Sequence, residues 1–178
     1  MTDFAWPLQS NRIRRDMLNH TFGMVRNGGS RPHQGWDLTA APMTSCYAIA
    51  DGEIAFTNDQ GDYGKVVVLK FDTSRETLWA AYCHLTFWVV KERDRVSRGD
   101  LLGYTGNSGN ARSMIGEDQH LHFEIRTVDR PGRGLTGRID PKDLYGHVPI
   151  GWAIFEAVGD KTAPRGVGLK VRGVNVRG

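Results

Sequence analysis

Cysteine is scarce in this sequence, which contains only Cys46 and Cys83, and these two do not form a C-x-x-C pair. Two residues cannot build the disulfide framework of a small secreted scaffold. We therefore expect two buried thiols, because free cysteine behaves in proteins as a small apolar side chain. A single disulfide between them stays open as an alternative, and it would favour an oxidising destination such as the periplasm.

Long hydrophobic runs are absent as well. No stretch approaches the roughly 20 apolar residues that span a bilayer, so we expect no insertion into a membrane. The opening residues, MTDFAWPLQSNRIRRD, have no apolar run after a basic segment. A secretory signal peptide needs such a run, and we therefore expect no cleavable signal.

Charge of one sign is concentrated only at the end of the chain. Lys and Arg number 23 against 20 Asp and Glu, which gives a net charge of +3. Residues 161–178 hold five of the bases and no acid, so the rest of the chain has 18 bases against 20 acids. This body has no basic stripe interleaved with aromatic residues, which excludes a nucleic-acid partner. We expect the tail to form an edge strand or a loose basic extension attracted to anionic polymers.

Long helical patterns and internal repeats are also missing. The 178 residues suit one domain, and 39% hydrophobic with 24% charged residues is ordinary for a globular protein. The 22 glycines separate short runs rich in β-branched and aromatic residues, such as KVVVLKF (65–71) and TLWAAYCHL (77–85). This pattern predicts a mainly β domain with little helix. The best helical candidate is the stretch 12–20.

Two histidines stand close together in the segment HLHFEIR (120–126). Strand alternation puts four polar side chains on one face, those of His120, His122, Glu124 and Arg126, and apolar side chains on the other. Two imidazoles about 6 to 7 Å apart along one strand can share a metal ion or a bound water. The alternative is a solvated strand face that carries its histidines by chance.

A second candidate lies in RPHQGWDLT (31–39), where His33 and Asp37 are four residues apart. Pro32 and Gly35 speak against a helix, so we interpret the segment as a bent loop that runs into a strand. Both side chains then point to one place. Such pairs also arise by chance, and an ordinary surface loop remains the alternative.

Zinc chemistry connects these two segments. A catalytic zinc usually has three protein ligands drawn from histidine and carboxylate, with the fourth position left to water or substrate. His33, Asp37 and one histidine of the His-x-His pair make such a set, and the other histidine is then free for proton transfer. His84, at the end of a predicted strand, adds another imidazole; its alternative is a purely structural role.

In their order along the chain, these motifs resemble the signatures of the LytM/lysostaphin-type zinc endopeptidases. The matching segments are H-x-x-x-D at 33–37, Tyr-x-His-Leu at 82–85 and His-Leu-His-Phe-Glu at 120–124. The entry segment around Phe22-Gly23 and the stretch VSRGDLLGYTGNSG (96–109) are similar to the family too. The resemblance covers residues 20–146, with extensions predicted at 1–19 and 147–178.

The resemblance implies an antiparallel β-sheet of the duplicated-hybrid-motif type with its active site in a groove. One zinc ion would be held by His33, Asp37 and His122. His84 and His120 would be the catalytic histidines that orient and deprotonate the zinc-bound water. The substrate class would be the peptide stems and cross-links of peptidoglycan, with the enzyme acting as a hydrolase on those peptide bonds.

Some positions depart from the family pattern. The link ARSMIGEDQ (111–119) is longer than in relatives and is expected to form one wall of the groove, with Glu117 and Asp118 solvated. No tyrosine shortly precedes H-x-x-x-D, so an electrostatic role for Arg26 or Arg31 is a further hypothesis. His20 and His147 match no signature, and we expect them to be surface or packing residues.

Two functions follow as hypotheses. The first is an active peptidoglycan endopeptidase, and the alternative is a catalytically inactive protein that binds cell wall or regulates another hydrolase. Inactive relatives typically lose ligands, whereas all three ligands and both further histidines are present here. We expect a monomer that acts in the periplasm or cell wall. Delivery by a specialised secretion system, with a carrier or an immunity protein, or by a phage would account for the missing signal; a trimmed sequence would as well.

Overall fold

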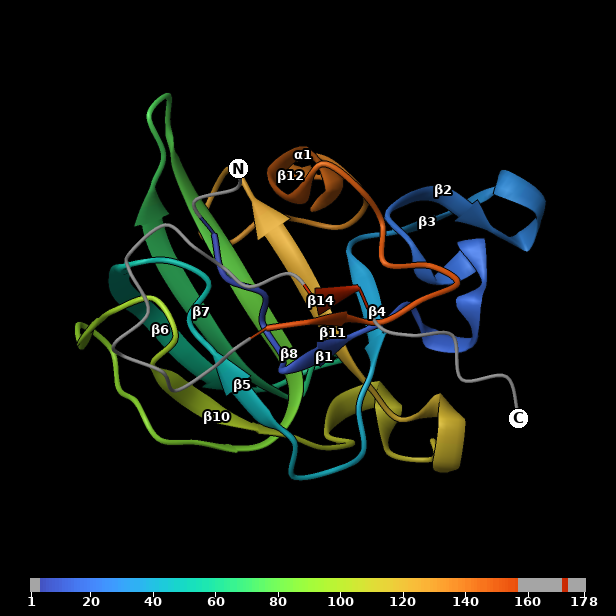
Figure 1. The fold of residues 1–178 in the computed structure, drawn as a ribbon, viewed down its shortest axis with the longest axis horizontal. Coiled ribbons are helices and arrows are strands. Elements are labelled where there is room, and N and C mark those ends of the chain that lie inside the picture. The colour runs from blue at the N-terminus through green and yellow to red at the C-terminus, as the bar shows by residue number, and fades with distance from the viewer. Residues whose placement is uncertain (1–3, 157–170, 173–178) are drawn as a thin grey trace.

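A nine-stranded antiparallel sheet dominates the computed structural model, which describes residues 4–156 and 171–172 (Figure 1). Its main path runs in the order β12-β11-β8-β7-β6-β9, while β4 pairs with β11, and β10 pairs with both β8 and β5. The strands of this sheet are β4 (Trp36–Thr39), β5 (Ser45–Tyr47), β6 (Gly52–Asp59), β7 (Lys65–Asp72), β8 (Thr77–Trp88), β9 (Arg95–Val96), β10 (Leu101–Thr105), β11 (His120–Arg126) and β12 (Arg138–Ile139).

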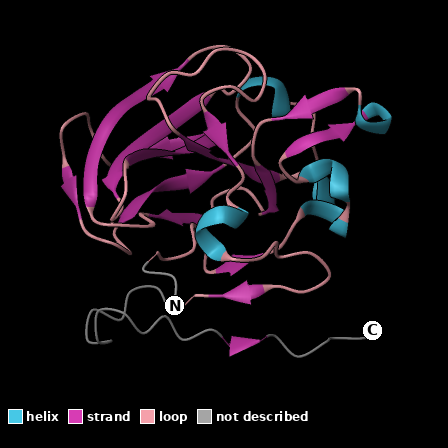
Figure 2. Ribbon diagram, turned by 90° about the horizontal axis from the view of Figure 1, so that it is seen from above, coloured by secondary structure: helices cyan, strands magenta, loops and turns pink. Residues whose placement is uncertain are grey.

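Two smaller sheets and several short helical turns complete the described part of the chain (Figure 2). One sheet has the order β1-β13-β14 and the other pairs β2 with β3. Their strands are β1 (Ser10–Asn11), β13 (Ile154–Phe155), β14 (Val171–Arg172), β2 (Gly23–Arg26) and β3 (Arg31–His33). The helical elements are η1 (Arg14–Asp16), η2 (Leu18–His20), η3 (Asn27–Gly29), η4 (Gly109–Ala111), η5 (Gly116–Asp118) and α1 (Lys142–Tyr145). The predicted mainly β, antiparallel fold with little helix is confirmed.

Strand β11 is an interior strand of the sheet, and all seven of its residues are buried. It pairs with β8 on one side and with β4 and β12 on the other. The predicted alternation holds, because Leu121, Phe123 and Ile125 belong to the main apolar core. The polar face is buried too, so the alternative of a solvated strand face is wrong.

The segment before residue 20 packs into the same core as the sheet. Trp6, Leu8 and Ile13 are fully buried. The ring of Trp6 stacks on Tyr145 at a centroid distance of 4.1 Å and on Trp36 at 6.1 Å. Residues at both ends of the described chain therefore meet on one side of the sheet and stabilise it together.

Replacing Trp6 by alanine is expected to lower the free energy of unfolding by about 3–5 kcal/mol, the usual cost of removing a large buried aromatic side chain. Urea unfolding followed by circular dichroism measures this difference. Trp152→Ala is the matched control, since Trp152 is 52% exposed and surface changes typically stay within about 0.5 kcal/mol. A loss below about 1 kcal/mol for Trp6→Ala would show that the N-terminal segment contributes little.

The helix expected over residues 12–20 is absent, and the two turns η1 and η2 take its place. Arg15 and Asp16 have φ values of 54° and 51°, in the left-handed region that interrupts a right-handed helix. Ile13, just before them, forms a β-bridge to Leu38 and is fully buried. Tertiary pairing of Ile13 therefore outweighs the helical pattern of the segment.

Both cysteines are free and fully buried, which confirms the predicted buried thiols and excludes the disulfide. Cys46 lies in β5 and Cys83 in β8. Burial raises the pKa of both thiols far above its ordinary value, because the low-dielectric interior disfavours the thiolate.

Neither thiol is expected to react with an aromatic disulfide reagent in the native protein, because the thiolate is the reactive form and these side chains are out of reach. In a denaturant both should react at once. Absorbance of the released thiolate, followed with and without guanidinium, measures the two stoichiometries. Fast reaction of even one thiol before unfolding would contradict this expectation.

The predicted basic tail lies mostly outside the described residues. Its described part, Val171–Arg172, forms β14 and pairs antiparallel with β13, as an edge strand of the small sheet. None of the described helices is long and apolar enough to cross a membrane.

Candidate metal centre

Strands β4 and β11 bring the two predicted motifs side by side. They pair antiparallel with Asp37 opposite His122, and His33 lies at the end of β3 a few residues earlier. Gly35 makes this approach feasible: a Cβ atom there would lie 2.2 Å from the Phe123 carbonyl oxygen. The glycine of the H-x-x-x-D segment therefore lets the loop cross β11 closely enough to reach the histidine on it.

Three donor atoms converge between these strands. His33 Nε2 lies 3.1 Å from Asp37 Oδ1 and 3.3 Å from His122 Nδ1, and the last two atoms are 2.9 Å apart. All three residues are buried. Two imidazole nitrogens and one carboxylate oxygen match in type and number the protein ligands of a catalytic zinc site.

Hydrogen bonds on the far side of each histidine orient these donors. His33 Nδ1 donates to the Thr21 carbonyl at 2.8 Å, which leaves Nε2 to face the centre. The other ring nitrogen of His122, Nε2, donates to Glu124 Oε1 at 3.0 Å. Metal-binding histidines usually carry such a partner on the second nitrogen, because it fixes the tautomer and the ring orientation.

The electrostatics of the cluster favour a cation. Burial opposes charge on His122, yet its hydrogen bonds to Asp37 and Glu124 raise its pKa to about 9. Burial lowers the pKa of the neighbouring His33. Asp37 is also buried, but hydrogen bonds from His122, His20 and His33 hold its pKa well below the ordinary value. The residues present therefore fit a divalent metal ion, whose positive charge would stabilise the buried carboxylates of Asp37 and Glu124.

The outer oxygen of Asp37 is bound by residues that precede it in the chain. Asp37 Oδ2 accepts hydrogen bonds from His20 Nδ1 at 3.1 Å and Arg26 Nη2 at 2.9 Å. His20 is buried, so of the expected surface or packing role only packing is compatible with the structure, and its hydrogen bond to Asp37 was not predicted. Of the two arginines suggested for an electrostatic role, Arg26 reaches the cluster and Arg31 is exposed.

His84 and His120 lie beside this cluster, with their rings 5.3 Å apart in an edge-to-face arrangement. His84 Nδ1 donates to the Ser108 carbonyl at 2.9 Å, and His120 Nδ1 donates to the Asp118 carbonyl at 2.8 Å. A carbonyl only accepts, so the lone pair of each ring is on Nε2. Burial lowers the pKa of both histidines, that of His84 to about 3, with help from the neighbouring histidines. The lowered pKa favours the neutral form of each ring.

Sequence reasoning missed the network behind His122. Tyr63 stacks its ring on His122 at 5.5 Å and donates its hydroxyl to Glu124 Oε1 at 2.6 Å. The other oxygen, Glu124 Oε2, accepts from Arg126 Nε at 2.7 Å and Arg138 Nε at 3.0 Å. Alternation had placed Glu124 and Arg126 on the polar face without a role. Tyr63 and Arg138 come from outside every motif, and only the fold brings them here.

Both acids of the link 111–119 lie within ion-pair distance of Arg15, and they differ in exposure. Glu117 is 82% exposed, as expected. Asp118 pairs with Arg15 at 2.7 Å, which the sequence did not predict. The beginning of the link, with Arg112 and Ser113, lines a surface depression of about 530 Å³ that Gly61 and Asp62 border on the other side. His147, as expected, packs, with its ring 5.7 Å from that of Trp6.

Comparison with curated proteins gives relatives much longer than this chain. DipM, a cell division protein of Caulobacter vibrioides, is 37% identical over 124 residues, which are 69% of this chain and 18% of DipM. The peptidoglycan DD-endopeptidase ShyA of Vibrio cholerae is 31% identical over 137 residues, which are 77% of this chain and 29% of ShyA. The chain thus spans less than a third of these relatives.

Solved structures agree on the fold. The catalytic domain of lysostaphin from Staphylococcus simulans aligns with a TM-score of 0.55 at 24% identity, covering 71% of this chain and 87% of that domain. Residues 31–134 match the family model described as Peptidase family M23, and this match spans more than half of the chain. Together with the LytM/lysostaphin-type fold, this match places the chain in peptidase family M23.

Proposed function

We propose that this chain is an active zinc-dependent endopeptidase that hydrolyses peptide bonds in the stems or cross-links of peptidoglycan. The observation that carries the proposal is the arrangement of five side chains. His33, Asp37 and His122 present three converging donors, and His84 and His120 present free Nε2 lone pairs beside them. A centre that only bound metal for stability would have no need of two further neutral histidines.

A bound zinc ion polarises a carbonyl and lowers the pKa of a water molecule that it binds. His120 Nε2 lies 3.5 Å from Asp37 Oδ1, at the edge of the donor cluster. From there it accepts the proton of the attacking water and returns it to the leaving amine. His84, held by Ser108, faces the same space and stabilises the charge that develops on the substrate oxygen.

The substrate class rests on relatives. ShyA is a peptidoglycan DD-endopeptidase by name, and it is 31% identical to this chain over 137 residues, which are 77% of the chain. We therefore propose peptidoglycan peptide as the substrate. A protein that cuts this substrate would act in the periplasm or cell wall. We further propose that the enzyme is a monomer. Delivery as an antibacterial effector, with a carrier or an immunity protein, or release by a phage are narrower proposals of the same kind.

The second candidate function is a catalytically inactive protein that binds wall or regulates another hydrolase. DipM, whose name describes a cell division protein and no peptidase, supports this alternative. The intact set of donors and neutral histidines favours the active enzyme. The two functions differ in one result, which is whether purified peptidoglycan is cut.

Digestion of purified peptidoglycan tests the proposal. The protein with zinc should release peptide-cleaved fragments, chelation should stop their release, and added zinc should restore it. Mass spectrometry of the fragments identifies the bond. Cleavage that persists after complete removal of metal would reject the zinc mechanism. Zinc binding and wall binding without cleavage would favour the regulator.

A further inference from the structure

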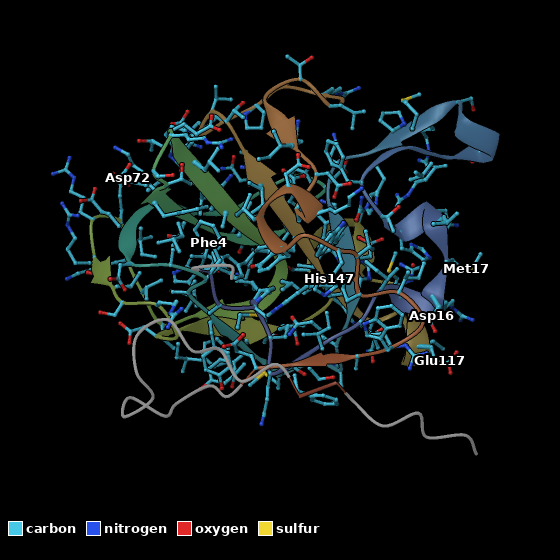
Figure 3. The ribbon with its side chains drawn as sticks, turned by 45° about the horizontal axis from the view of Figure 1, so that its top comes forward. Phe4, Asp16, Met17, Asp72, Glu117 and His147 are labelled. Atoms are coloured by element: carbon cyan, nitrogen blue, oxygen red, sulfur yellow. The ribbon has the colours of Figure 1, made fainter. Side chains whose placement is uncertain are left out.

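The turn η1 and the link that carries η5 meet next to His120. Arg15 Nε lies 2.7 Å from Asp118 Oδ1, and Arg14 Nη2 lies 3.5 Å from the same oxygen. Arg15 also reaches Glu117 at 3.6 Å. Figure 3 accordingly places Asp16, Met17 and Glu117 at the same end of the molecule. Two arginines from the N-terminal segment thus hold one aspartate of the link.

Asp118 connects this ion pair to the site. Its carboxylate forms ion pairs with both arginines, and its backbone carbonyl accepts the hydrogen bond from His120 Nδ1 at 2.8 Å. Arg14 Nη1 also lies 3.4 Å from His120 Nδ1, but the carbonyl is closer and can only accept, so the hydrogen bond to Asp118 favours the tautomer with the proton on Nδ1. The ion pairs that position Asp118 therefore also position the carbonyl oxygen that fixes the His120 tautomer.

Hydrogen bonds within its own turn and one bond from the end of β4 anchor the backbone around Asp118: the Ala40 amide donates to the Gln119 carbonyl at 3.2 Å. The Asp118 and Gln119 amides bond to Ile115 and Gly116 within the same turn, at 3.1 Å each. Ile115 is 77% exposed, and so packs against little. Contacts from outside the turn, such as those of the two arginines, are consequently important for where the Asp118 carbonyl lies.

The turn that presents the arginines is itself held in an unusual conformation. Arg15 and Asp16 both have positive φ, which only a surrounding structure that fixes them can maintain. Asp16 accepts hydrogen bonds from the Arg12 side chain and from the Gly151 amide, the latter at 2.8 Å. The strained turn precedes residue 31, where the match to the family begins. Its arrangement is therefore a feature of this chain outside the matched range.

We propose that Arg15 is a positioning residue that acts through Asp118: with Arg14 as a second partner of the same carboxylate, it holds the carbonyl that keeps the proton of His120 on Nδ1, so that Nε2 stays free toward the reacting water. The inference rests on the proposed function, because it assigns that base role to His120. It adds that the N-terminal segment is part of the working site and not a separable extension.

A double-mutant cycle on a soluble cross-linked muropeptide tests the proposal. Asp118→Ala should lower kcat about 10-fold, as loss of an outer partner of a site residue does, with KM and zinc content unchanged. Arg15→Ala should lower kcat less, because Arg14 remains, and Arg15→Lys should restore it. The double variant should be no slower than Asp118→Ala alone. Glu117→Ala is the matched control, expected to stay within 2-fold of the parent protein.

Losses that multiply in the double variant, or an Asp118→Ala variant within 2-fold of the parent, would overturn the proposal. Should Asp118→Ala fold poorly by its unfolding midpoint, Arg15→Ala decides alone, since its side chain is 43% exposed. In that variant an unchanged kcat overturns the proposal.

Nitrogen NMR of the His120 imidazole gives a readout that does not depend on activity. The zinc-loaded parent protein should show one tautomer with the proton on Nδ1, and Asp118→Ala should show a mixture. This result in a protein that cuts no peptidoglycan would reject the proposed function and keep the positioning role. An unchanged tautomer in Asp118→Ala, with cleavage intact in the parent, would reject the positioning role and keep the function.

Discussion

His120→Ala is expected to lower kcat by about 10²–10⁴-fold, the range that a positioned general acid–base group contributes. His120 is only 3% exposed and has its Nε2 free beside the donor cluster. No other neutral base in the described chain is arranged to replace it except His84, whose ring lies 5.3 Å away. The rate of muropeptide cleavage, measured at saturating zinc, gives the effect.

The same variant should still bind one zinc ion, because His120 is not among the three converging donors. The zinc content of the variant therefore distinguishes a loss of proton transfer from a loss of the metal ion. His147→Ala serves as the matched control, since that histidine packs against Trp6 away from the cluster. An His120→Ala enzyme that keeps more than a tenth of the parent kcat would contradict the proposed base.

A double variant that lacks both His84 and His120 tests whether the two histidines act in one catalytic step or in separate ones. Groups that act as one unit give losses that do not multiply. If His84 stabilises charge while His120 moves the proton, the double variant should be slower than either single variant. Retention of the same rate in the double variant and in His120→Ala would instead assign both rings to a single step.

Local patterns predicted the parts of the site that depend on local geometry. The alternation in β11 set the face of His120 and His122, because side-chain direction in a strand follows from the backbone alone. Gly35 and Pro32 marked the bend before Asp37 in the same way. The core assignments of Leu121 and Phe123 follow from the same period, and the structure places both in the core.

The parts that sequence reasoning missed depend on contacts between distant segments. His20 reaches Asp37 because η2 folds back over β4, and no spacing in the sequence encodes that contact. Tyr63 reaches Glu124 across 61 residues. The stretch 12–20 has a helical pattern, but the buried bridge of Ile13 to Leu38 overrides it. Motif order predicted the family, whereas the outer hydrogen bonds of the site needed the fold.

Arginines surround both carboxylates of the site. There the cations Arg14 and Arg26 face the carboxylate of Asp37, at 3.9 and 2.9 Å. Two more, Arg126 and Arg138, bind Glu124. Asp37 and Glu124 each pair with two arginines. Removing the negative charge of either carboxylate therefore leaves arginine cations that repel a bound metal ion.

Asp37→Asn is therefore expected to lower zinc affinity by more than the roughly 10–100-fold that loss of an outer hydrogen-bond partner costs, and to abolish cleavage. Asp37 Oδ1 faces the two histidine donors while Oδ2 accepts from Arg26 and His20. An amide cannot serve both sides. If its oxygen faces Arg26, its NH₂ group points at the nitrogen lone pairs; in the opposite orientation, NH₂ meets two other donors.

Competition with a chromophoric chelator measures the affinity, and elemental analysis gives the zinc content of the isolated variant. Asp59→Asn is the matched control: it removes the same charge from a half-exposed carboxylate whose ion-pair partner, among the described residues, is Lys65. Asp37→Asn changes the charge and hardly the volume of the side chain, so we expect the variant to fold. Its unfolding midpoint without metal, compared with that of the parent protein, tests this. A folded Asp37→Asn protein that binds zinc as tightly as the parent would remove Asp37 from the proposed ligand set and leave the two histidines without a carboxylate partner.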